Sequence, residues 1–134
     1  MRRGQLSLTV VEAGVGVLLI LAVAGGFAFG VPSPNTTRPQ LDAYAEDTAT
    51  VLAREPPRHQ GATRLAEVAG SERAFVRERD ALDRRVDRIL PDNLLYRIET
   101  PQGAVGYRRP AGAPAGRATV TTLGGDVTIW VWYA

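Results

Sequence analysis

Apolar residues change their spacing along the chain, and each spacing predicts a different kind of element. Residues 13–31 form a run of 19 without a charge, rich in Val, Leu, Ile and Ala, and a helix of about 20 such residues spans the core of a bilayer. Residues 41–55 show helical spacing, whereas residues 94–133 show stretches of alternating apolar and polar positions. The pattern predicts an α+β protein: a long N-terminal transmembrane helix, then short helices and a C-terminal antiparallel β-meander.

Three short helices are expected between the apolar run and the strands. The first covers residues 41–55 and ends at Pro56-Pro57, and the second covers residues 62–69, with Gly70 as its stop. Ser71 is suited to cap a third helix that continues to about Leu90. Its apolar positions at helical spacing are expected to form a buried stripe of Phe75, Leu82, Val86 and Ile89.

Four strands are expected after Asn93, at residues 94–99, 104–108, 117–122 and 127–133. The Gly124-Gly125 pair favours a tight hairpin, because such turns need positive backbone dihedrals. The last strand carries large side chains on both faces, with Trp130 and Trp132 opposite the aliphatic residues. The two indoles either pack over neighbouring strands or form a candidate interface for a partner, since aromatic residues dominate protein interfaces.

The composition excludes several classes of chemistry. The chain has no cysteine and one histidine, His59, so disulfides and thiolate metal sites are impossible and little is left for acid/base catalysis. Its basic residues are all arginine, and without residues 1–31 the net charge is about +1, from 14 bases and 13 acids. A near-neutral body is a poor electrostatic partner for nucleic acid. We therefore expect no enzyme, no cofactor, no metal and no nucleic acid.

The chain is expected to divide into a leader and transmembrane helix (residues 1–31), a linker (32–40) and a small extracytoplasmic α+β domain (41–134). Prolines and hydroxyl residues make the linker a semi-rigid spacer. Arg2 and Arg3 precede the apolar run, and no basic residue follows it until Arg38. Since basic residues favour the cytoplasmic side, we expect a single-pass protein of the cell membrane with a cytoplasmic N-terminus and an extracellular domain. On that side, Asn35-Thr36-Thr37 matches the N-glycosylation acceptor pattern at Asn35.

The leader carries a more specific motif. Arg3-Gly4-Gln5, followed by a short polar stretch, Glu12 and an apolar helix, resembles the class III leader of type IV pilins, above all the archaeal form. The order of leader, helices and terminal hairpins is also similar to that of small pilin-like membrane proteins that haloarchaea encode in clusters. The resemblance implies that a prepilin peptidase cuts between Gly4 and Gln5, and that the helix then assembles with other pilin-like subunits in a surface filament.

The resemblance also implies an assembly role for Glu12. An acid in or near hydrocarbon is costly unless it is paired, and in pilin assemblies the partner is the N-terminal amine of a neighbouring subunit. A cut after Gly4 would create that amine on Gln5. The sequence departs from bacterial pilins at this point, because Glu12 would be the eighth residue of the mature chain rather than the fifth.

Two other interpretations of the leader remain open. In the first, residues 13–31 are a plain anchor that displays an envelope binding domain, and Glu12 lies near the interface, where a charge costs little. In the second, they belong to a secretory signal that ends at Ala22-Val23-Ala24, before Gly25. Against the second interpretation, an acid separates the arginines from the apolar run, and the run continues past the proposed cut.

Overall fold

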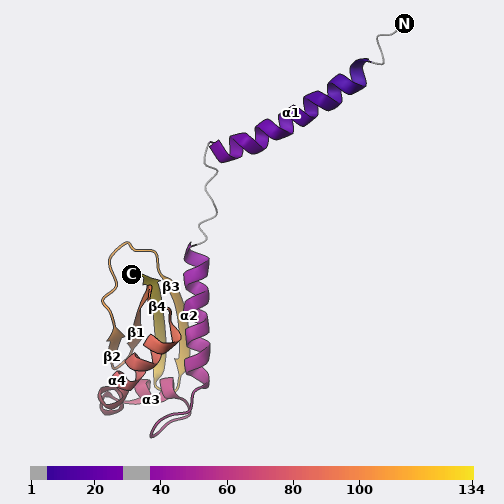
Figure 1. Cartoon of the computed structure of the whole chain (residues 1–134). Coiled ribbons are helices and arrows are strands. Elements are labelled where there is room, and N and C mark those ends of the chain that lie inside the picture. Colours follow the sequence, from indigo (N-terminus) through magenta and orange to yellow (C-terminus); the bar gives the residue numbers. More distant parts are fainter. Residues whose placement is uncertain (1–5, 29–36) are drawn as a thin grey trace. The chain divides into compact units, whose positions relative to one another are not determined.

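The computed structural model describes residues 6–28 and 37–134, and the chain divides into two compact units, Met1–Asn35 and Thr36–Ala134. In the first unit, the helix α1 runs from Leu6 to Ala28 (Figure 1). The expected cleavage residues Arg3, Gly4 and Gln5 and the expected glycosylation residue Asn35 lie outside the described residues, so these four assignments remain predictions.

The second unit contains three helices, α2 (Thr37–Arg54), α3 (Arg64–Gly70) and α4 (Glu72–Ile89). α2 begins before the expected residue 41, with Pro39 in its first turn. Proline is tolerated there because its missing N–H group would have no partner inside the helix. Thr63 and Ser71 cap α3 and α4, each with a side-chain oxygen that accepts a backbone N–H group. The predicted cap at Ser71 is confirmed.

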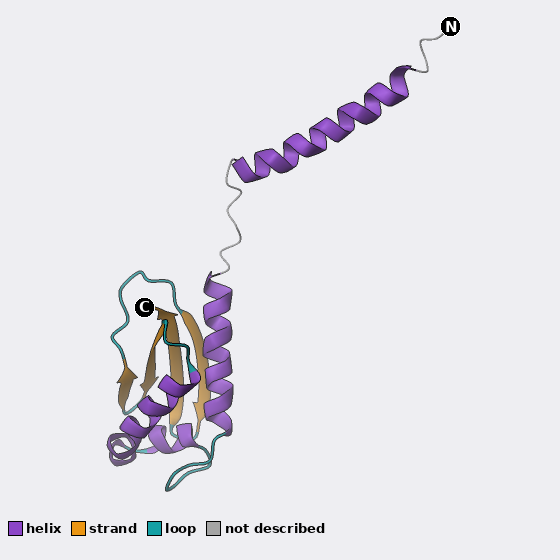
Figure 2. Ribbon diagram, in the orientation of Figure 1, coloured by secondary structure: helices purple, strands orange, loops and turns teal. Residues whose placement is uncertain are grey.

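Four strands follow α4: β1 (Leu94–Thr100), β2 (Gly103–Gly106), β3 (Gly116–Thr122) and β4 (Gly125–Tyr133). All neighbouring strands are antiparallel, as the predicted α+β class requires, and their order is β2-β1-β4-β3 (Figure 2). Two hairpins therefore lie side by side through β1 and β4. The connection from β2 to β3, residues 107–115, leads from one edge strand to the other.

One face of the sheet forms the core with the three helices of this unit (Figure 1). Alternation along β1 and β4 places Tyr96, Ile98 and Ile129 inward, each at most 1% exposed. The expected stripe on α4 is largely confirmed, because Phe75, Leu82 and Val86 are buried and Ile89 is partly buried. The other helix residues buried in this core are Leu41, Ala45, Ala49, Leu52, Leu65, Val68 and Ala69.

The second unit has two distinct ends. At the end where α2 begins, here called the linker end, the hydroxyl group of Tyr133 donates to Gln40 at 3.0 Å. Figure 1 places the C-terminus and the 107–115 connection at the same end. At the opposite end, here called the hairpin end, the two hairpin turns lie beside α3, and the side chain of Gln102 donates to the carbonyl of Ala69 at 3.4 Å. Surface groups can therefore be assigned to one end or the other.

Candidate functional site

α1 is the first candidate for function, because it has no core to bury its apolar surface in. Within residues 6–28 and 37–134, it is the one helix long and apolar enough to cross a membrane, through Leu8–Gly25. None of the residues in that span is buried, and Leu8, Leu18 and Ile20 are each more than 65% exposed. A helix that is apolar on all sides needs lipid or other helices around it. α1 is therefore a candidate single-pass membrane anchor.

Glu12 lies in the first half of α1, and its side chain is exposed within the chain. No group of the described residues forms an ion pair or a hydrogen bond with it. A partner from another copy, the assembly role expected for Glu12, remains a prediction.

Trp130 and Trp132 lie on the face of the sheet opposite the core. Trp132 stands across from Leu95 and is 2% exposed, so it packs within the domain and offers almost no surface to a partner. Trp130 is half-buried and stands between Arg97 of β1 and Arg117 of β3 in the strand register. Of the two indoles expected at an interface, only Trp130 reaches the surface.

Two guanidinium groups cover the indole of Trp130. The Cζ atom of Arg109, from the 107–115 connection, lies 4.1 Å from the ring centroid, and that of Arg117 lies 5.2 Å from it. Contacts of this kind are worth about 0.5–1 kcal/mol each at exposed sites. The candidate interface is therefore cationic at its surface, a property that the isolated tryptophans in the sequence did not indicate.

A second cluster lies in the loop between α2 and α3 and involves Glu67, which is 3% exposed. Its carboxylate accepts the backbone N–H groups of Arg58 at 3.2 Å, of His59 at 2.9 Å, and of Gln60. Burial alone would raise the pKa of Glu67, but these three donors and the charge of Arg77 hold the pKa below its ordinary value. Glu67 therefore folds the loop back onto α3.

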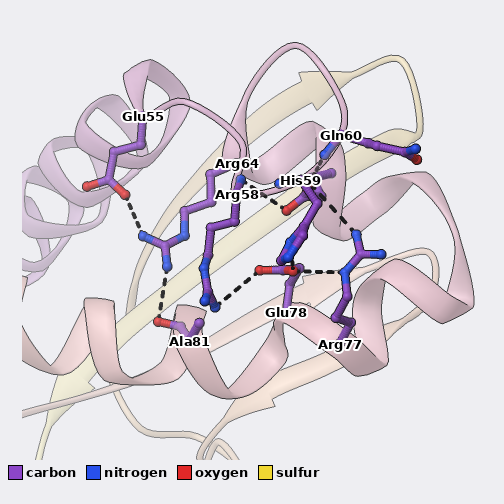
Figure 3. Close-up of polar contacts among 9 residues, drawn as sticks. Glu55, Arg58, His59, Gln60, Arg64, Arg77, Glu78 and Ala81 are labelled. Atoms are coloured by element: carbon purple, nitrogen blue, oxygen red, sulfur yellow. Dashed lines mark hydrogen bonds and ion pairs between the residues drawn. The ribbon is translucent and has the colours of Figure 1, made fainter.

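Glu78 of α4 is the ionic centre of the same cluster (Figure 3). Its carboxylate, 2% exposed, lies 2.7 Å from Nδ1 of His59, 2.9 Å from Nε of Arg77 and 3.5 Å from a guanidinium nitrogen of Arg58. His59 is exposed in the loop, and its contact with Glu78 could not be foreseen from the sequence. The burial of Glu78 is hard to predict from sequence, because this residue looks like one more member of the charged face of α4.

Ligand atoms of His59, Glu67 and Glu78 lie within 4.8 Å of one another, a spacing at which three groups can hold a cation. However, Arg58 and Arg77 already supply positive charge to these two carboxylates, and a metal ion would have to displace them or be repelled by them. The geometry is that of a cluster that holds a loop in place.

Glu55 forms a third ionic group at the end of α2 (Figure 3). It lies 2.8 Å from Arg64 and 2.5 Å from Arg85, and Arg64 also donates to the carbonyl of Ala81 at 3.3 Å. Burial would raise the pKa of Glu55, but the two guanidinium groups lower it overall. This group ties α2, α3 and α4 together.

One of three comparisons with known proteins gives a match. No curated protein and no solved structure matches the chain. One family model matches residues 2–133, described as a family of unknown function. Since the match covers both units, the chain belongs to the family of unknown function DUF7262.

Proposed function

We propose that the chain is a membrane-anchored, pilin-like subunit or minor component of a surface filament, and that it assembles through its N-terminal helix. In this proposal, a prepilin peptidase hydrolyses the bond between Gly4 and Gln5. Water adds to the carbonyl of Gly4, and the products are the peptide MRRG and a mature chain with a free amine on Gln5. The mature helix then leaves the bilayer and packs against the helices of other subunits.

The observation that carries the proposal is the unburied apolar surface of α1. Its 23 residues contain one acid, Glu12, and no base, and no residue of the Leu8–Gly25 span is buried. Lipid can cover this surface before assembly, and neighbouring helices can cover it afterwards. The Arg3-Gly4-Gln5 motif adds the means of passing from one state to the other.

The glycines of α1 support contact with other helices. A methyl group placed on Gly14 or Gly16 would meet no atom of the chain within 4 Å, so the fold of the chain does not require glycine there. Glycine in a helix interior costs about 1 kcal/mol relative to alanine. Small residues in membrane helices allow close approach of a second helix, which would compensate for this cost.

The packing of the second unit supports separate roles for the domain and for α1. The core of this unit is formed by residues of α2, α3, α4 and the sheet. The domain therefore does not need α1 for its own packing. The helix is free to serve as an anchor or as an assembly element.

The decisive experiment is the mass of the N-terminal peptide of the native protein. The proposal expects a mature chain that begins at Gln5. A chain that retains Arg2 to Gly4 would contradict the cleavage, and a new N-terminus at Gly25 would identify an ordinary secretory signal instead. Gly4→Trp should abolish the change in mass, whereas Ser7→Trp, a matched change of bulk nearby, should leave it intact.

The arginine-covered Trp130 favours a second candidate function, a plain single-pass anchor that displays a binding domain. An exposed cationic surface is a reasonable recognition site. In that case the leader stays intact, Glu12 tolerates substitution, and the N-terminal mass is that of the uncut chain. The same measurement therefore separates the two candidates.

A further inference from the structure

Arg109 and Arg117 cover Trp130 on the outer face of the sheet. Arg108 precedes Arg109 in the 107–115 connection, and we call these three residues the arginine patch. All three are exposed. Among residues 6–28 and 37–134, no carboxylate lies within 4.0 Å of their guanidinium groups. Six of the eleven other arginines in residues 37–134 are paired with acids: Arg58, Arg64, Arg77, Arg79, Arg85 and Arg97. The patch therefore presents charge that the domain itself does not neutralise.

The patch is held in position by its surroundings. Arg117 is part of β3, and its backbone N–H group donates to Asp42 of α2 at 2.9 Å. Arg109 lies over the indole at 4.1 Å, and the indole belongs to the central strand β4. A guanidinium group fixed on an aromatic ring loses less freedom when it binds an anion. The arrangement favours recognition of a flat, anionic surface by several arginines together.

The patch lies at the linker end of the domain. Arg117 follows Gly116, and a methyl group built on Gly116 would come 2.0 Å from the carbonyl carbon of Leu41 in the first turns of α2. Arg108 and Arg109 belong to the 107–115 connection, which lies at the same end (Figure 1). Arg38, also exposed, adds a fourth positive charge beside the start of α2.

The length of the linker limits how far this end can be from the membrane that α1 would cross. Residues 29–36 connect α1 to α2, and eight residues reach at most ~28 Å when fully extended. The covalent chain therefore allows the linker end to reach the headgroups.

Two acids of α2 lie beside Arg117: Asp42 accepts its backbone N–H group, and Glu46 lines the same hollow as Arg117. Asp87 and Asp92 line a hollow between α4 and β1, beside Tyr96. The exposed acids of a second copy, among them Glu46, Asp80 and Asp126, belong to separate elements, α2, α4 and β4. A second copy is therefore a poorer partner for the patch than a continuous anionic surface.

We propose that the arginine patch docks on the anionic lipid headgroups of the membrane that holds α1. The inference rests on the proposed membrane anchoring, concerns the chain before assembly, and adds an orientation: the outer sheet face at the linker end turns toward the bilayer. Guanidinium groups bind phosphate through paired hydrogen bonds. Each arginine near an anionic surface contributes about 1 kcal/mol, so each should strengthen the contact roughly five-fold.

The test uses the full chain in lipid nanodiscs of two compositions, one zwitterionic and one with a third of its lipid anionic. The chain has only two tryptophans, Trp130 and Trp132, and both lie on the outer sheet face. Quenching of their emission by a nitroxide on the lipid headgroup therefore reports how close this face is to the membrane. Expressing emission relative to discs without nitroxide removes the effect of each variant on the indole itself.

Stronger quenching is expected in the anionic discs, and 0.5 M salt should abolish the difference. The double variant Arg108→Gln/Arg109→Gln should weaken the contact by about 25-fold and lose the difference. The control Arg54→Gln/Arg73→Gln removes the same charge from two exposed arginines away from the linker end and should behave as the wild type.

Three outcomes would overturn the inference. Equal quenching in both lipid compositions would show that the patch does not recognise anionic lipid. Quenching that depends on the number of copies per disc, but not on lipid charge, would identify a second copy as the partner. Failure of the chain to enter the discs would remove the anchoring itself, and it would be seen separately as protein that does not co-purify with lipid.

Discussion

The carboxylate of Glu67 in α3 accepts the backbone N–H group of His59 at 2.9 Å, and this bond holds the loop that precedes α3 against the helix. The neighbouring N–H groups of Arg58 and Gln60 point to the same carboxylate. The Glu67 side chain thus accepts the backbone N–H groups of a loop that has no helix or strand to satisfy them.

Glu67→Gln should destabilise the domain by about 2 kcal/mol, because hydrogen bonds to a charged acceptor are worth about 1.5–3 kcal/mol. Urea unfolding of the full chain in detergent micelles, followed by circular dichroism, measures the change. Glu46→Gln, an exposed site on α2, is the matched control and should have an effect within about 0.5 kcal/mol. Equal effects of the two substitutions would refute the role assigned to Glu67.

The stability of the domain should fall in acid. The pKa values of Glu55 and Glu67 are lowered by folding, from an ordinary value of 4.5. Their contribution is therefore complete above the unfolded pKa, and it is lost as the pH falls below 4.5 toward the folded pKa, because the unfolded chain then binds more protons.

Unfolding free energies between pH 7 and pH 3 check this expectation. The double variant Glu55→Gln/Glu67→Gln should be less stable at pH 7 and should show a flatter dependence on pH than the wild type. A pH dependence as steep as that of the wild type would mean that other carboxylates are responsible.

Gly116 should be intolerant of any side chain. A methyl group there would lie 2.0 Å from the carbonyl carbon and 2.1 Å from the carbonyl oxygen of Leu41, and these backbone atoms cannot move without displacing α2 from β3. Gly116→Ala should cost about 3 kcal/mol. Gly70→Ala is the control, since a methyl group on Gly70 would meet nothing within 4 Å, and a comparable loss of stability there would contradict the steric explanation.

Gly14→Ile and Gly16→Ile test assembly without disturbing the domain. Since a Cβ atom built on either glycine would meet nothing within 4 Å beyond the adjacent helix backbone, both variants should keep the wild-type unfolding transition. Their assembly should be strongly reduced, because the larger side chain prevents close helix contact. Crosslinking of native membranes measures assembly, and Leu18→Ile, a change of equal volume on α1, is the control. Unaltered crosslinking in both glycine variants would argue for a plain anchor.

Much of the fold could be predicted from sequence, because it depends on local signals. Ser71 and Gly70 mark the boundary between α3 and α4, and the Gly124-Gly125 pair marks the last hairpin. The pairing order of the strands was not predictable in this way. It depends on contacts between β1 and β4, which are far apart in the sequence, and an alternating pattern alone does not specify a neighbour.

The surface chemistry was less accessible to sequence reasoning. Trp130 and Trp132 alternate with aliphatic residues, and nothing in that pattern tells that one indole is 2% exposed while the other lies beneath two arginines. Glu78 was similarly hidden among the charged positions of α4. Its carboxylate contacts Arg77, which also lies 3.8 Å from Glu67 of α3. Such contacts require the tertiary structure.

The position of β4 has a consequence for the order of events in the cell. The first strand of the sheet pairs directly with the last one, from Leu94 opposite Tyr133 to Glu99 opposite Thr128. Until residues 125–133 have been synthesised, β1 lacks its central partner and the inward face of the sheet cannot close over α2. The sheet can therefore close only when β4 is available, so the folding of the domain waits for its last strand.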